Sequence, residues 1–204
     1  MNIKKLGLIF PALLGLLLSS GVYAATTPPD LMVQNTANEV LEILKSSKDV
    51  ENGDMKKMGK LVEDKIATKF DFDRMSGLML GDVWNAASKQ QQDQFTTEFR
   101  SLLVRTYSSA LSKYRDQTIE YKPLRAGSGD SDVKVKTQIM QLSGSPIPLD
   151  YRLAKIEDNW KVYDVIIDGL SLVTMYRGQF SGEVKLNGLS GLIQKLSDKN
   201  KRSL

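Results

Sequence analysis

The sequence predicts an α+β protein in which helices pack on a curved, four-stranded antiparallel sheet. Apolar residues recur at steps of three and four through the first half of the chain, and at steps of two between residues 117 and 167. The expected helices precede the strands instead of alternating with them, which is typical of α+β folds. Residues 165–167 are apolar without alternation, so both faces of their strand must be covered. A sheet of that kind indicates an interior enclosed between layers.

Three helices are expected before the longest one. Helical spacing of apolar residues predicts a helix over 30–47 and a second over 54–69. Asp71 is expected to cap a short third helix, because its carboxylate can accept hydrogen bonds from free backbone N–H groups. This helix is expected to end at Gly81, since glycine readily leaves helical geometry.

The longest helix has the clearest signal. Ser88 and Gln91 have the spacing of a capping box, in which each side chain bonds the backbone N–H of the other residue. Aromatic and aliphatic residues then recur at steps of three and four from Phe95 to Tyr114. A face this wide must lie against a large apolar surface, and we expect that surface to be the sheet.

Four strands are expected over 117–123, 133–139, 147–153 and 160–167. The connections between them are short and rich in Gly, Pro, Ser, Asp and Asn, so the four strands form an antiparallel meander. After 160–167 the apolar residues continue as far as Phe180 without a polar loop. A last helix is expected from about Gly188.

The first 24 residues have the pattern of a secretory signal. Lys4 and Lys5 precede a short apolar stretch, and small residues follow up to Ala24. A membrane anchor is the alternative, but it needs about 20 apolar residues, and Pro11 interrupts a shorter run. Cleavage after Ala24 leaves residues 25–204 as one domain.

Composition excludes several chemistries. The chain has no cysteine, so it has no disulfide and no thiol to which a lipid could be attached, and it has no histidine, the commonest general base. Without Lys4 and Lys5 the chain has 26 basic and 24 acidic residues, and its one basic run, 195–202, contains Asp198. We therefore expect no nucleic-acid binding. Carboxylate or tyrosine chemistry remains the only enzymatic route.

Two segments carry a resemblance to a known family. These are residues 70–114, and residues 160–180 followed by 188–196. The pattern combines Leu80-Gly81, Trp84, Ser88, Gln94-Phe95, Tyr107, Trp160, Gly169, Tyr176-Arg177 and Phe180. It resembles the MlaC family, the periplasmic phospholipid-binding component of the maintenance-of-lipid-asymmetry transport system, also known as toluene-tolerance auxiliary transport proteins. Asp168 departs from the pattern, since many relatives carry Glu there, and the first helix matches only in length.

The resemblance implies a cone-shaped core like that of nuclear transport factor 2, with added helices and an apolar interior pocket. It also implies that residues 25–204 are a single lipid-binding domain, acting in the periplasm as a monomeric carrier without a catalytic step. Bound phospholipid is then cargo, and no cofactor or metal is expected. The implied partners are an outer-membrane lipoprotein–porin complex and an inner-membrane ABC transporter with its lipid-binding domain subunit.

A pocket for acyl chains must be aliphatic and aromatic with almost no charge. We expect it to be lined from the helices by Met75, Leu78, Phe99, Leu103 and Tyr107, and from the sheet and beyond by Val133, Val135, Ile139, Tyr151, Leu153, Val165, Ile167, Leu170 and Val173. A two-tailed ligand needs a cavity of about 1,000 Å³. The alternative is that these residues form a filled core. Arg177 either meets the lipid phosphate or pairs with a carboxylate.

Two other functions compete with a carrier. The first is an enzyme that uses Asp164 or Asp168 as general base, with Tyr163 or Tyr107 beside it. The second is a chaperone or scaffold that shields apolar segments of other proteins. The lack of histidine and of a convergent polar cluster argues against the enzyme.

Overall fold

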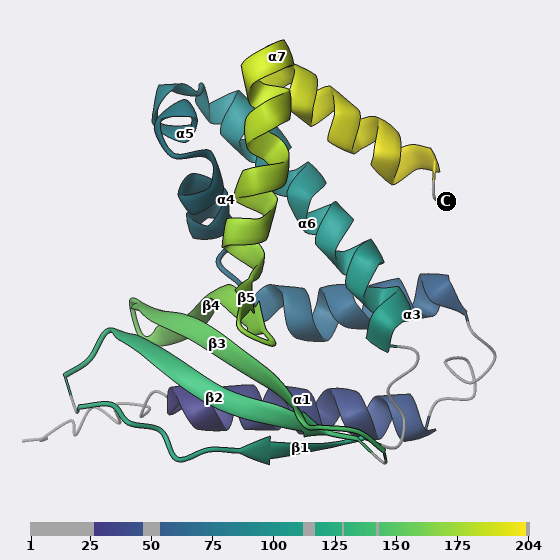
Figure 1. Cartoon of the computed structure of the whole chain (residues 1–204), viewed down its shortest axis with the longest axis vertical. Helices are drawn as coiled ribbons and strands as arrows, with labels where there is room; N and C mark the ends of the chain where they lie inside the picture. Colours follow the sequence, from purple (N-terminus) through teal and green to yellow (C-terminus); the bar gives the residue numbers. More distant parts are fainter. Residues whose placement is uncertain (1–26, 47–53, 112–116, 128, 142, 203–204) are drawn as a thin grey trace, which may run out of the picture.

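The computed structural model describes residues 27–46, 54–111, 117–127, 129–141 and 143–202 (Figure 1). The expected signal segment, with its cleavage point after Ala24, lies outside these residues. The described elements are α1 (Pro29–Ser46), α3 (Met55–Leu61), a π turn (Val62–Ile66), a 3₁₀ turn (Ala67–Lys69), α4 (Phe72–Leu80), α5 (Asp82–Ala86), α6 (Lys89–Leu111), β1 (Thr118–Tyr121), β2 (Asp132–Met140), β3 (Ile147–Ile156), β4 (Asn159–Ile167), β5 (Leu170–Ser171) and α7 (Leu172–Arg202). The α+β class is confirmed.

The sheet is an open antiparallel meander of five strands in the order β1-β2-β3-β4-β5. The expectation of four strands was one short. Asp168 and Gly169 both have positive φ, 49° and 81°, and this tight turn folds Leu170 back onto Ile167. Asp-Gly is a preferred pair for such a two-residue hairpin. Because β5 has only two residues, periodicity could not detect it.

A bulge explains why β4 does not alternate. Arg152 pairs with Asp164 and Leu153 pairs with Val162, so Tyr163 is an extra residue between two ladder pairs. The hydroxyl of Tyr163 itself donates a hydrogen bond to Asp132 Oδ1 at 2.8 Å. The bulge therefore lets two residues three positions apart, Val162 and Val165, pair with neighbours on the same face of the sheet.

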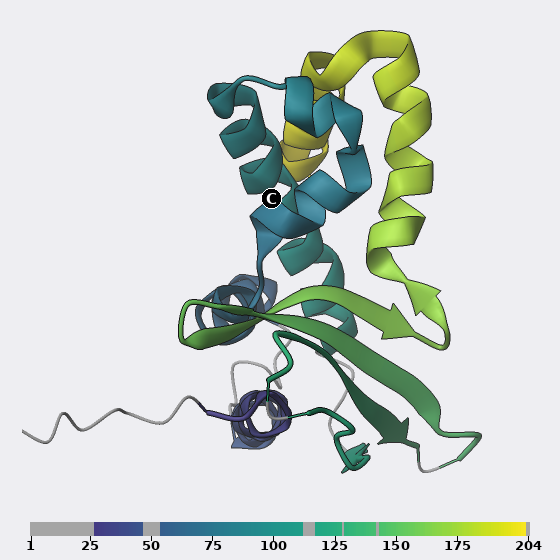
Figure 2. The ribbon, with the colours of Figure 1, turned by 90° about the vertical axis from the view of Figure 1, so that its left-hand side faces the viewer.

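Helices cover the two faces of the sheet unequally. Figures 1 and 2 show α1 along one face, while α4, α5, α6 and α7 rise from the other. The long helix α6 packs mainly on α7, α4 and α3, so the expectation that it crosses the sheet was wrong. The aromatic stripe of α6 meets an equivalent stripe on α7, and ring centroids of Phe99 and Tyr176 lie 5.3 Å apart.

The helix caps follow the sequence signals. Asp71 Oδ1 accepts the backbone N–H of Arg74 at 2.9 Å. Ser88 Oγ accepts the N–H of Gln91 at 3.2 Å, and Gln91 Oε1 accepts the N–H of Ser88 at 3.0 Å. Both caps are therefore confirmed, including the reciprocal bonds of the capping box.

Helix α7 begins well before the expected start at Gly188. Its first half is capped from the sheet: Asp164 on β4 accepts the hydroxyl of Ser171 at 2.7 Å and the backbone N–H of Val173 at 3.2 Å. The expected start is instead a kink, because Gly188 has φ 67° inside the helix. The apolar run up to Phe180 is thus helical and packs on α6, which its continuous hydrophobicity did not reveal.

Candidate functional site

Helix α1 supplies one wall of a cavity. Pro29 begins the helix, at a position where its missing N–H costs nothing. Val33 and Val40 are buried, and Thr36 and Ala37 lie between them on the same stripe. Two polar contacts attach the outer side of α1: Lys65 Nζ lies 2.6 Å from Glu39 Oε1, and the hydroxyl of Tyr121 donates to Asn38 Oδ1 at 3.4 Å.

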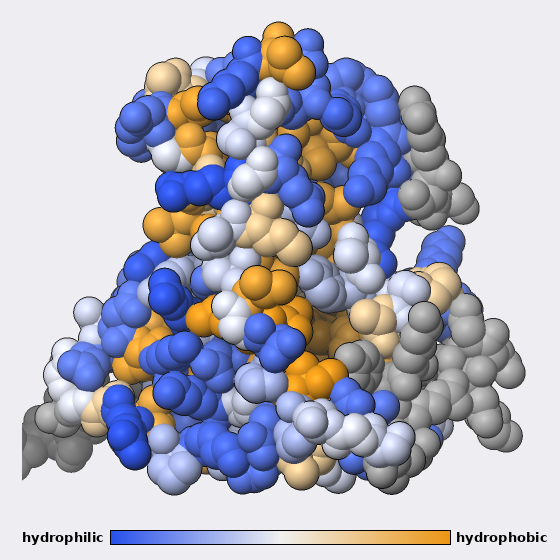
Figure 3. All heavy atoms as spheres, viewed as in Figure 1, coloured by the Kyte–Doolittle hydropathy of each residue, from blue (hydrophilic) through white to orange (hydrophobic). Residues whose placement is uncertain are grey.

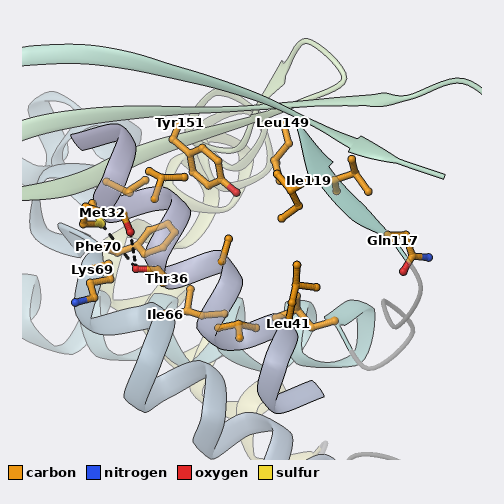
Figure 4. Close-up of a pocket in the computed structure, with 16 residues that line it drawn as sticks. Met32, Thr36, Leu41, Ile66, Lys69, Phe70, Gln117, Ile119, Leu149 and Tyr151 are labelled. Carbon is orange, nitrogen blue, oxygen red and sulfur yellow. Dashed lines mark hydrogen bonds between the residues drawn. The ribbon is translucent and has the colours of Figure 1, made fainter. Parts of the chain in front are cut away.

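The cavity between α1 and the sheet has a volume of about 170 Å³ (Figure 4). It is lined by Met32, Val33, Thr36, Ala37, Val40, Leu41, Ile66, Lys69, Phe70, Leu111, Gln117, Ile119, Ile139, Leu149, Tyr151 and Val162. Most of these side chains are aliphatic or aromatic. The surface that they form is as apolar as hydrocarbon, and it offers few hydrogen-bond partners to water.

The sheet contributes residues that its register places on one face. Ile119 on β1 pairs with Ile139 on β2, and Leu149 and Tyr151 alternate along β3. Opposite them in Figure 4 lie the side chains of α1. Because alternate residues of a strand share a face, a short stretch of three strands makes one continuous apolar wall.

The chain before α4 closes the cavity on a third side. The π turn and the 3₁₀ turn bring Ile66, Lys69 and Phe70 to the lining. Phe70 forms a parallel bridge with Val162, and the backbone N–H of Asp71 donates to Val162 O at 2.8 Å. This backbone link fixes the third wall to the sheet.

Most polar groups of the cavity are satisfied locally. The hydroxyl of Thr36 donates to Met32 O at 2.8 Å. Burial raises the pKa of the Tyr151 hydroxyl, so that it stays neutral through the physiological range. Two groups differ: Gln117 Oε1 is buried without a hydrogen-bond partner, and the Lys69 ammonium has no ion pair or hydrogen bond within the described part of the chain.

The structure divides the residues expected from the sequence among four places. Ile139 and Tyr151 line the cavity. Beside it on the same face of the sheet, in the core cluster that includes Val33 and Val162, lie Val133, Val135, Leu153 and Val165, with Ile167 packed against them. Met75, Phe99, Leu103 and Val173 lie in the separate core of the helices, and Tyr107 contacts both clusters. Leu78, Leu170 and Arg177 are exposed.

Leu78, Leu170 and Arg177 lie on the surface of the protein and away from the cavity. Leu170 is 70% exposed at the β4–β5 turn, and Leu78 is 40% exposed on α4. In Figure 3 apolar atoms gather on this face where the sheet meets the helices, with hydrophilic surface around them. Arg177 lies on α7 near Gly81 and is absent from the cavity lining. None of the three residues meets the cavity in this conformation.

The contribution of α1 was missed by the sequence analysis. The helical spacing of Val33, Ala37 and Val40 predicts the helix correctly, but gives no sign of its partner. The pairing of α6 with the sheet was favoured instead because the apolar face of α6 is larger. Ile119 and Leu149 carried a usable signal, since both lie at inward positions of strands that the sequence predicts.

The groups considered for acid–base chemistry do not converge. Asp164 is engaged in capping α7, and Tyr163 bonds Asp132. Asp168 is exposed in the β4–β5 turn. Burial, with a further contribution from Tyr176, raises the pKa of Tyr107 to about 12. No carboxylate in the described ranges lines the cavity, so a desolvated base facing a ligand is missing there.

The described residues offer neither a metal site nor a membrane-spanning helix. Among the described residues, no group of three or more histidine, cysteine, aspartate or glutamate side chains is arranged to hold a metal ion. None of the helices in the described ranges combines the length and the hydrophobicity that crossing a membrane requires.

Comparison with protein families gives a match over most of the chain. A family model described as MlaC protein matches residues 34–198. The toluene tolerance protein ttg2D of Pseudomonas putida is 29% identical over 166 residues, covering 81% of this chain and 76% of the relative. The intermembrane phospholipid transport system binding protein MlaC of Haemophilus influenzae is 22% identical over 198 residues, covering 96% and 92%.

A solved structure agrees with the fold. The phospholipid-binding protein of Ralstonia solanacearum, determined in complex with a phospholipid, superposes with a TM-score of 0.80 at 38% sequence identity. The alignment covers 86% of this chain and 98% of that one. The similarity therefore extends through the helices and the sheet.

Proposed function

The chain belongs to the MlaC family, and from this we propose that it is a phospholipid carrier that holds acyl chains between α1 and the sheet. Its role is to transfer lipid between membranes without a chemical step. The observation that supports this most directly is the apolar cavity itself, whose lining contains one charged residue, Lys69, among the residues described.

The energetics suit a carrier. A phospholipid with about 30 buried CH₂ groups gains on the order of 24 kcal/mol on leaving water, at about 0.8 kcal/mol per group. Nearly all of this gain cancels when the lipid comes from a bilayer, so the cavity needs only to equal the membrane. An aliphatic lining with neutral tyrosine and threonine hydroxyls meets this requirement, whereas several buried charges would not.

Loading requires the cavity to widen. Its volume of about 170 Å³ is far below the roughly 1,000 Å³ that a two-tailed ligand needs. We propose that α1 moves away from the sheet to admit lipid, because few polar contacts hold its outer side. The sheet residues beside the lining on the same face, Val133, Val135, Leu153 and Val165, then become part of the pocket. The expected residues Met75, Phe99, Leu103 and Val173 lie in the separate core of the helices, and movement of α1 would leave them outside the pocket.

The cellular setting is also a proposal. Family membership and the signal-like segment at 1–24 support action in the periplasm after cleavage at Ala24. The partners that we propose are an outer-membrane lipoprotein–porin complex and an inner-membrane ABC transporter with its lipid-binding domain subunit. We propose further that the open sheet with its covering helices is a variant of the cone-shaped core of nuclear transport factor 2.

Mass spectrometry of the protein purified without denaturation tests the proposal. We expect complexes that carry phospholipid, and organic extraction of the same sample should release it. Protein that carries no lipid, and that takes up none from vesicles of phosphatidylethanolamine and phosphatidylglycerol, would overturn the proposal.

The same preparation separates the rival functions. Replacing Asp164 and Asp168 by asparagine should leave lipid content per folded molecule unchanged, since neither carboxylate lines the cavity. Competition between phospholipid and an unfolded polypeptide for the protein would favour the chaperone instead.

A further inference from the structure

Lys69 is the only charged residue that lines the cavity in the described part of the chain. Its stem contributes to the wall near Thr36 and Met32, and its ammonium points away from the cavity in Figure 4. A lysine in this position buries its methylene groups against apolar surface while its charge stays in water. The residue therefore marks a rim at which an apolar ligand would meet solvent.

Within the described residues, no carboxylate pairs with the positive charge at this rim. Glu39 on α1 is paired with Lys65 at 2.6 Å, and Asp64 is paired with Lys60 at 2.7 Å. Lys161 adds a second ammonium, which donates to the carbonyl of Thr68 at 2.6 Å, next to Lys69 in the chain. Two ammonium groups thus lie near this part of the wall, while Glu39 and Asp64 are already paired.

The opposite end of the cavity is electrically different. There Gln117 presents a neutral amide whose oxygen is buried without a partner. In Figure 4 Lys69 and Gln117 lie at opposite ends of the lining. Leu149 and Ile119 lie between these two residues, toward Gln117. Among the described residues, an anionic lipid group placed at Gln117 would have no counter-charge on the wall, whereas at Lys69 it meets a cation without an ion pair.

We propose that Lys69 binds the phosphodiester of the cargo and so determines which end of the cavity the headgroup occupies. This inference rests on the proposed carrier function and adds to it the orientation of the lipid and a preference for lipids with a phosphate. The tails extend from Lys69 toward Gln117, and the headgroup remains in solvent. Arg177, the alternative contact expected from the sequence, is not among the residues that line the cavity.

The test compares two lipids that share their tails. Delipidated protein is offered equal amounts of dioleoylphosphatidylglycerol and dioleoylglycerol in detergent, and the bound ratio is measured by native mass spectrometry after detergent removal. Lys69→Met keeps the length of the stem and removes the charge. We expect the ratio of phospholipid to diacylglycerol to fall by roughly three- to tenfold, as for the loss of one partly exposed ionic contact.

Matched variants locate the effect. Lys69→Arg should keep the wild-type ratio. Lys136→Met removes the same charge from an exposed position on β2 that does not line the cavity, and should also keep it. Repeating the measurement with inorganic phosphate at constant ionic strength should leave the ratio unchanged. If free phosphate abolishes the preference, Lys69 is a site for small anions and the lipid assignment is overturned.

The remaining outcomes are distinct. An unchanged ratio in Lys69→Met would overturn the role of Lys69 alone and leave the carrier function standing. A changed ratio in Gln117→Leu, with none in Lys69→Met, would place the headgroup at the other end. Wild-type protein that binds neither lipid would overturn the carrier function, and this inference with it.

Discussion

The two core regions of this molecule are both built from apolar residues but are filled differently. In the helical region, Phe95 and Phe99 are completely buried, and their rings contact Phe180 at centroid distances of 5.8 and 6.1 Å. Between α1 and the sheet, aliphatic side chains from facing surfaces leave a cavity of about 170 Å³. Interlocking aromatic rings close the first region, while the second keeps the space that a carrier needs. Stability and cargo binding can thus be changed separately.

The largest expected effect is on the closed region. Phe99→Ala should lower the free energy of unfolding by about 3–5 kcal/mol, because the neighbouring rings cannot collapse into the space left. Urea denaturation measures this, and Phe99→Leu offers a milder variant if the alanine protein does not fold. Lipid content per folded molecule should be unchanged. A loss below about 1 kcal/mol would mean that this region is as loosely filled as the other.

The second largest effect on stability is expected at the connection between the two regions. Asp164→Asn leaves one acceptor where the carboxylate served both Ser171 and Val173, and should cost about 1–3 kcal/mol. Asp168→Asn is the matched control, because asparagine tolerates the positive φ of that turn. Thermal unfolding of both variants checks this. Equal stability of the two would show that the cap on α7 contributes little.

Filling the open region should separate stability from binding. Ala37→Leu places an isobutyl group in the cavity, and should raise the stability of the empty protein by about 1 kcal/mol through added apolar burial. It should also reduce lipid uptake from vesicles. Ala86→Leu, on an exposed position of α5, should change neither quantity. If Ala37→Leu binds lipid normally, the acyl chains lie elsewhere.

The smallest effect concerns alkaline pH. The pKa of Tyr107 is raised to about 12 by burial, and that of Tyr151 is raised by the same cause. A tyrosine whose pKa is higher in the folded state stabilises the protein fully below about pH 10, and this contribution is lost as the pH rises toward the folded value. Tyr107→Phe and Tyr151→Phe should each make stability less dependent on pH above 10. Parallel curves for wild type and variants would contradict this.

Features that depend on neighbouring residues were predictable from the sequence. The caps at Asp71 and Ser88 need only a side chain and a backbone N–H a few positions away. The four main strands followed from alternation, and turn residues marked their ends. The two-residue β5 and the bulge at Tyr163 were not predictable, because each involves too few residues to form a pattern.

The candidate site was harder to predict because it depends on which surfaces meet. Ile139 and Tyr151 were identified as lining residues, since their strand positions point inward. Phe99 and Leu103 pack in the core of the helices, because the stripe on α6 is complementary to α7, and periodicity does not report a partner. For the same reason, the sequence did not predict that the smaller apolar stripe of α1 faces the sheet.

The π turn at Val62–Ile66 makes the length of this segment critical. A π turn is equivalent to one residue inserted in an α-helix. Deleting a residue there would allow an ordinary helix to form, and would rotate the following side chains by about 100° relative to α3. Ile66, Lys69 and Phe70 would then all leave the lining together. A substitution at one of these positions changes the wall at one residue, whereas a change of one in the number of residues would dismantle the wall.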